Sequence, residues 1–81
     1  MVVYVLVNTI TKLDSLQTAM FVLYVSFDVA HLVNMAEAEV GEKLNWVPNT
    51  DEGEENILFH AVASNDGNVE VSYDIVAAML V

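Results

Sequence analysis

The segment Tyr24-Val25-Ser26-Phe27-Asp28-Val29-Ala30 decides the fold, because the spacing of apolar residues changes within it. Before it, residues 16–25 are rich in β-branched and aromatic side chains, as expected for a strand that is buried on both faces. After it, apolar residues recur every three or four positions, which is typical of a helix, and Gly41 stands where the helix should end. The residues with this helical spacing are Val29, Leu32, Val33, Ala36 and Val40.

The start of this helix, predicted over about residues 27–40, carries its own signals. Ser26 can accept a hydrogen bond from one of the first free N–H groups, and Asp28 places negative charge in a first turn that favours it. Phe27 is positioned to pack back on the sheet. The solvent side of the helix is expected to hold Glu37, Glu39, His31 and Asn34. A rival interpretation joins residues 14–40 into one long helix, but residues 21–25 are apolar all round and too β-branched to favour it.

Four further strands are expected around this junction. Residues 2–10 form the first, and the polar residues 11–15 make a hairpin loop to the strand at 16–25, so these two should pair antiparallel. Residues 43–47 predict a short strand that Pro48 stops, since proline cannot donate to a ladder. Two last strands, residues 56–64 and 68–76, flank the turn signal Asn65-Asp66-Gly67.

The register of the final hairpin can be chosen from its side chains. A two-residue turn at Asp66-Gly67 would place Phe59 opposite Asp74. A three-residue turn with Gly67 in the left-handed conformation keeps apolar partners on one face and leaves Glu70, Ser72 and Asp74 on the other, so it is preferred. The preferred pairs are Ala63 with Val69, Ala61 with Val71, Phe59 with Tyr73 and Ile57 with Ile75. The fold class is therefore α+β, an antiparallel sheet of about five strands in the order ββαβββ with one helix packed on one face.

Composition limits both the fold and the function. The 81 residues predict one domain, and 56% of them are apolar, which is more than so short a chain readily buries. Twelve acidic residues face two lysines, giving a net charge of −10 and no basic footprint for binding nucleic acid directly. The start of the sequence does not resemble a signal peptide, and the apolar run 19–33 is shorter than the roughly twenty residues that span a bilayer. A cytoplasmic protein without membrane contact is expected.

The pattern of elements is similar to that of small acidic accessory proteins of tailed bacteriophages. The similarity comprises a first hairpin, an aromatic-x-Ser-x-Asp-x-Ala helix start, a Trp-bearing strand and a final hairpin, at residues 3–7, 24–30, 46 and 57–75. Helices in those proteins are usually more charged than residues 29–33 here. The resemblance implies a phage or mobile-element setting, in which small viral proteins commonly inhibit host or defence machinery by binding. It transfers no catalytic residues.

Chemical sites are sparse. Asp28 and His31 lie one helical turn apart with His60 as a distant third ligand, but they lack a compact metal-binding spacing. The acids at 51–55 lack the spacing of a calcium loop, so a solvated loop is the preferred interpretation. No serine has the glycine context of a nucleophile, and no phosphate-binding loop is present. The absence of cysteine excludes a disulfide framework and a thiolate metal site. The sequence predicts a protein that is not an enzyme and that needs no metal or other cofactor.

Two non-enzymatic functions remain open. In the first, the protein inhibits a host or defence protein by occluding a basic surface that binds nucleic acid, unless the acids serve only to keep an apolar chain in solution. In the second, it is an assembly protein whose main activity is homo-oligomerisation, as a homodimer or larger, because residues 3–7 and 20–25 are apolar on both faces. The acidic residues predicted to bind the partner are Asp51, Glu52, Glu54, Glu55, Glu37, Glu39 and Glu42.

Overall fold

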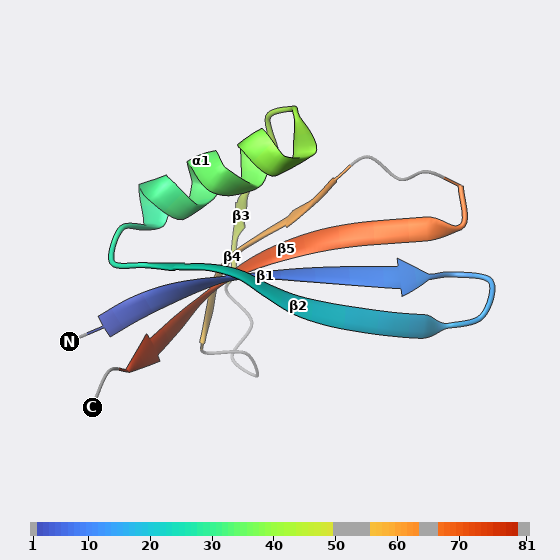
Figure 1. Cartoon of the computed structure of the whole chain (residues 1–81), viewed down its shortest axis with the longest axis horizontal. Helices are drawn as coiled ribbons and strands as arrows, with labels where there is room; N and C mark the ends of the chain where they lie inside the picture. The colour runs from blue at the N-terminus through green and yellow to red at the C-terminus, as the bar shows by residue number, and fades with distance from the viewer. Residues whose placement is uncertain (1, 50–55, 64–66, 80–81) are drawn as a thin grey trace.

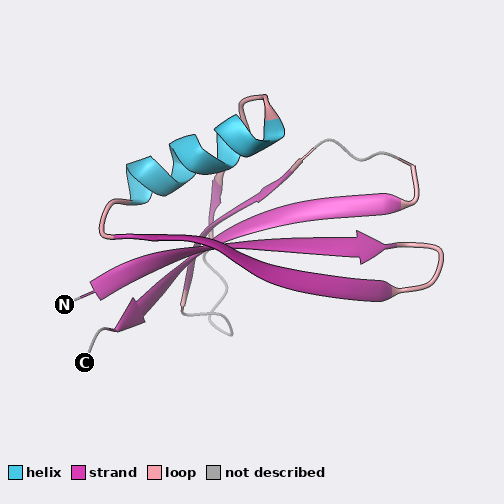
Figure 2. Ribbon diagram, viewed as in Figure 1, coloured by secondary structure: helices cyan, strands magenta, loops and turns pink. Residues whose placement is uncertain are grey.

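A computed structural model shows one five-stranded antiparallel sheet with a single helix on one face, as the sequence predicts (Figures 1 and 2). The structure describes residues 2–49, 56–63 and 67–79. The elements run β1 (Val2–Lys12), β2 (Gln17–Ser26), α1 (Val29–Val40), β3 (Val47–Pro48), β4 (Ile57–Val62) and β5 (Val69–Met79). The strand order is β2-β1-β5-β4-β3, which places the first and last long strands together at the centre of the sheet. The rival single helix over residues 14–40 does not form.

The core lies between α1 and the three long strands. Leu32 and Ala36 of the helix are fully buried against Leu6 of β1 and Ile75 of β5, with Tyr73 completing the cluster. The helical spacing read from the sequence therefore marks the packed face correctly. Figure 1 shows the helix over the half of the sheet nearest the start of β1, while the β1–β2 hairpin extends well beyond it. In the part of the chain that the structure describes, no helix lies above the far half of the sheet.

The caps of α1 confirm its end and correct its start. Gly41 adopts the left-handed conformation at φ 84° and donates its N–H to the Glu37 carbonyl at 2.8 Å, as the sequence predicts. The N-cap is Asp28, whose carboxylate accepts from the Ala30 N–H at 3.0 Å. Ser26 instead accepts from the Asp28 N–H at 3.1 Å, one step before the helix. The assignment of the cap to Ser26 was wrong, because two residues, Phe27 and the extended Asp28, separate the end of the strand from the first helical residue, Val29.

The prediction that β2 is buried on both faces is also wrong. β2 is the edge of the sheet, and Met20, Val22 and Val25 are 68%, 66% and 61% exposed. Phe27, expected to pack on the sheet, is 63% exposed as well. Leu16, expected to begin the strand, lies in the preceding turn with a positive φ of 55°. The composition of β2 resembles that of a central strand, but the strand order leaves one side of β2 without a neighbour among the described strands.

The last two strand predictions need correction in detail. The short strand occupies Val47–Pro48 and not residues 43–47, so Pro48 lies inside it, which an edge position tolerates. In the β4–β5 hairpin, Ala61 pairs with Tyr73 and Phe59 with Ile75, two residues from the preferred register. A shift of two preserves the faces, which is why the predicted apolar face is nevertheless the buried one. Gly67 has the predicted left-handed conformation, at φ 66°.

Candidate functional site

The predicted acidic site is only partly described by the structure. Its loop residues, Asp51, Glu52, Glu54 and Glu55, lie outside the described residues. The remaining three, Glu37, Glu39 and Glu42, gather at the C-terminal end of α1 and just beyond it, and are here called the acidic helix end. These three residues differ in their exposure and in their contacts.

Glu37 supports the fold, and the prediction that it faces solvent is wrong. Its side chain is only 13% exposed, and it accepts the backbone N–H of Leu44 at 2.8 Å. Lys43 lies 3.7 Å from its other carboxylate oxygen. Glu37 therefore fixes the segment that follows the helix, and its carboxylate contributes little to the exposed surface of the acidic helix end. The sequence analysis assigned Glu37 to the solvent side, because helical spacing does not indicate that the turn beyond Gly41 folds back over this side chain.

Glu39 and Glu42 are both exposed. The Glu39 carboxylate accepts a hydrogen bond from the Tyr24 hydroxyl of β2 at 3.2 Å, which links the helix to the edge strand. That hydrogen bond raises the pKa of the Tyr24 phenol above its ordinary value, and the negative charge of Glu39 and desolvation raise it further. No basic residue stands in the last turn of α1, where the helix dipole is itself negative. The acidic helix end thus combines three carboxylates and the negative end of the helix dipole with one lysine, Lys43, so its potential is negative.

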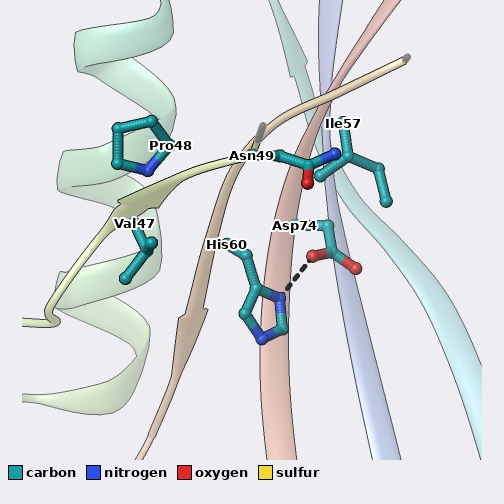
Figure 3. Close-up of a pocket in the computed structure, with 6 residues that line it drawn as sticks. All are labelled: Val47, Pro48, Asn49, Ile57, His60 and Asp74. Carbon is teal, nitrogen blue, oxygen red and sulfur yellow. Dashed lines mark hydrogen bonds and ion pairs between the residues drawn. The ribbon is translucent and has the colours of Figure 1, made fainter. Parts of the chain in front are cut away.

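A second feature is an open cleft on the sheet face opposite α1. It has a volume of about 240 Å³ and is lined by Val47, Pro48, Asn49, Ile57, His60 and Asp74 (Figure 3). Within it, His60 Nδ1 lies 2.6 Å from Asp74 Oδ1, and both side chains reach the surface, at 45% and 21% exposure. An oriented histidine is one part of many catalytic sites, but the lining residues include no hydroxyl or thiol that could act as the nucleophile.

The sequence analysis missed this histidine–aspartate pair, and the register explains why. In the preferred register His60 would face Ser72, whereas in the structure it pairs directly with Asp74. A hydrogen bond between side chains that face one another across two strands stabilises their pairing, so the His60–Asp74 contact was the available signal for the correct register. The possible metal site at Asp28, His31 and His60 has no counterpart: the described residues contain no group of three or more such ligands that could hold a metal ion.

The third feature is the sheet face opposite α1 together with the free side of β2. Leu6 is buried under the helix, so its neighbours Val5 and Val7 point to the opposite face, here called the open face. Val25 and Val22 pair with these two valines and share that face. The apolar open face therefore runs from half-buried valines in the middle of the sheet to the exposed Val22 and Val25 at its edge.

No family model, curated protein or solved structure matches the chain. No described helix is long and apolar enough to cross a membrane.

Proposed function

We propose that this protein acts by binding a larger protein, with no catalytic step of its own, and that it covers a positively charged surface of that partner. The partner is a host or defence protein whose basic surface holds nucleic acid. The setting is the bacterial cytoplasm during phage infection, as the resemblance to phage accessory proteins implies.

The position of the exposed acids at the end of α1 carries the proposal. Acidic side chains at a helix C-terminus are each unfavourable by about 0.3–1 kcal/mol, because they face the negative end of the dipole. Glu39 and Glu42 nevertheless stand there, without a basic residue in the last turn. The hydrogen bond from Tyr24 gives Glu39 a part in the fold, and both carboxylates lie on the exposed surface, where a basic partner can approach them.

The net charge supports the same function. A body of 81 residues with charge −10 attracts basic surfaces over long range and speeds their encounter. The same field repels nucleic acid, so the protein would compete with nucleic acid for its partner and would not bind the nucleic acid itself.

The first step of the test is capture from a bacterial lysate at low ionic strength with the full chain as bait, followed by measurement of the association rate with the captured protein. Two neutralised variants probe the acidic residues. One combines Asp51→Asn, Glu52→Gln, Glu54→Gln and Glu55→Gln, and the other combines Glu39→Gln and Glu42→Gln. The matched control, Asp14→Asn with Glu70→Gln, removes two exposed acids near the β1–β2 hairpin.

Both neutralised variants should slow association several-fold and flatten its dependence on salt, because charges at the rim of an interface act mainly on the association rate. The control should change the rate less than the helix-end variant does. If all three variants associate at the rate of the parent, the acids serve only to keep the chain in solution, and the proposal is overturned.

A second candidate function is assembly, in which homo-oligomerisation is the main activity. The observation that favours it is the exposed apolar edge strand β2, with Met20, Val22 and Val25 each more than 60% exposed. Self-association that persists without any other partner, in a chain whose neutralised variants behave like the parent, would support this candidate over the first.

A further inference from the structure

We propose that β2 is a self-association edge at which two copies of this chain pair antiparallel, β2 against β2, around a two-fold axis between their Met20 residues. The product is one continuous ten-stranded sheet with both helices on the same side. This inference does not depend on the acidic-surface proposal, and it supplies an interface for the assembly candidate.

The distribution of charge selects β2 for contact between copies. Two chains of charge −10 repel one another, so they approach best where neither carries charge. Residues 15–27, between Asp14 and Asp28, contain no acidic or basic residue and form the longest such stretch in the sequence. β2 lies entirely within this stretch. The other long strands, β1 and β5, contain Lys12 and the acids Glu70 and Asp74.

Apart from one bulge, β2 also lacks the features that usually protect a sheet edge. Natural edge strands are short, or they carry lysine, proline or inward-pointing charge. β2 has ten residues, with no proline and no charged side chain. It contains one bulge, near Leu23, where the register with β1 shifts between Leu6 and Val7. The segment Gln17–Val22 before this bulge pairs regularly with β1, and no other described strand pairs with its outer side.

The hydrogen-bond pattern shows which backbone groups this edge offers. The Leu13 N–H donates to the Asn68 carbonyl at 2.6 Å, so odd-numbered residues at this end of β1 direct their polar groups toward β5 and even-numbered ones toward β2. The Ala63 N–H donates to the Val71 carbonyl at 2.9 Å, which gives β5 the matching alternation. Gln17, Ala19 and Phe21, which face Lys12, Ile10 and Asn8, therefore bond to β1. The groups left pointing outward belong to Thr18, Met20 and Val22.

One antiparallel register engages all three of these residues on both copies. It pairs Met20 of one copy with Met20 of the other, and Thr18 with Val22 on either side of the axis. Each of the three pairs exchanges two N–H···O bonds. The side chains of these residues lie on the open face, since Thr11, Thr9 and Val7 opposite them on β1 lie there. Met20 and Val22, both more than 60% exposed in the single chain, would then pack beside the side chains of the second copy.

A second copy fits this edge better than a strand of unrelated sequence, because the edge is complementary to itself. The two-fold operation matches every outward donor with an acceptor and places uncharged side chains against uncharged side chains. The open face of β4 and β5 is less suitable for such a contact, since it carries Glu70, Asp74 and His60, which face-to-face packing of two copies would bury.

The first test is the mass of the full chain, measured by sedimentation over the micromolar range, for the parent and for Met20→Pro. The Met20 N–H points to solvent in the single chain, and proline is tolerated at such positions of edge strands. The variant should keep the parent's circular dichroism spectrum and raise the dimer dissociation constant at least about tenfold. Met20→Leu, which keeps the outward N–H and an apolar side chain, is the control that should leave the dimer intact. A parent that is monomeric throughout, or a dimer that Met20→Pro leaves unchanged, would overturn the proposal.

The second test reports on the register and does not rely on the proline variant. The chain has no cysteine, so Met20→Cys introduces a single thiol. Hydrogen-bonded antiparallel partners have Cα atoms about 5.5 Å apart, within the range of disulfide geometry. Thr18→Cys is the control, because the two Thr18 Cα atoms would be about 14 Å apart, four residues along the strand. Under mild oxidation the first variant should form a covalent dimer and the second should not. Equal cross-linking of both, or of neither, would contradict this register.

These outcomes are separable from those of the acidic-surface proposal. Loss of the dimer in Met20→Pro with unchanged partner binding would support self-association alone. Slower partner binding in the Glu39→Gln, Glu42→Gln variant with an unchanged dimer would support the acidic surface alone.

Discussion

At the residue scale, the contact between Glu39 and Tyr24 connects the two surfaces that we propose for binding, the acidic helix end and the edge strand β2. Glu39 belongs to the acidic helix end, and Tyr24 belongs to the edge strand β2. The carboxylate accepts from the neutral phenol, so the folded state favours the protonated tyrosine and the pKa of Tyr24 is raised. Replacing Glu39 therefore has a local effect that can be measured apart from any effect on binding.

We predict that Glu39→Gln lowers the pKa of Tyr24 toward the ordinary value of about 10 for a tyrosine. Because the folded-state pKa lies above the unfolded one, the contribution of this contact to stability is full below pH of about 10 and is lost as pH rises through the folded-state pKa. NMR titration of the tyrosine ring carbons would measure the shift, with Glu42→Gln as the control. A Tyr24 titration that does not move in Glu39→Gln would show that this hydrogen bond does not persist in solution.

A second residue-scale prediction concerns the corrected helix cap. Asp28→Ala should lower the free energy of unfolding by about 1 kcal/mol, because the Ala30 N–H loses its acceptor. Ser26→Ala should cost less, since Ser26 bonds to a residue outside the helix. Urea denaturation at neutral pH would compare them, with Asp28→Asn as the variant that keeps the cap. A larger loss for Ser26→Ala than for Asp28→Ala would return the cap to Ser26.

At the scale of elements, what the sequence could predict was local. Helical spacing identified the buried face of α1, and Gly41 and Gly67 marked positions that need positive φ. The edge position of β2 could not be read from its residues, because it depends on β5 taking the other side of β1, a pairing between the two ends of the chain. The β4–β5 register failed for a similar reason. Registers two residues apart bury the same face, so the apolar pattern alone does not separate them.

The hairpin turn gives the prediction at this scale. Gly67→Val should lower the free energy of unfolding by roughly 1–2 kcal/mol, because a β-branched residue resists the left-handed conformation at φ 66°. Space is not the cause, since no atom lies within 4 Å of a Cβ built there. Gly67→Asn, which tolerates this conformation, should cost less. Thermal unfolding curves that coincide for parent and Gly67→Val would rule out the turn as described.

At the scale of the whole molecule, charge and apolar surface are separated. Exposed acids stand at the end of α1, while the edge strand β2 is uncharged and exposes Met20, Val22 and Val25. The sequence correctly indicated that one helix leaves apolar sheet surface uncovered, and the structure places the most exposed part of it at the edge. We propose that one surface binds a basic partner and that the other binds a second copy of the chain. The two contacts should respond to salt in opposite ways.

A sedimentation salt series from about 50 to 500 mM is the most direct test of this separation. It would follow the chain alone and the chain with its captured partner. Rising salt should weaken binding of the basic partner, because it screens attraction between opposite charges. It should leave the β2–β2 dimer unchanged or tighter, because it screens repulsion between two chains of charge −10. Partner binding that is independent of salt, or a dimer that dissociates as salt rises, would contradict the account.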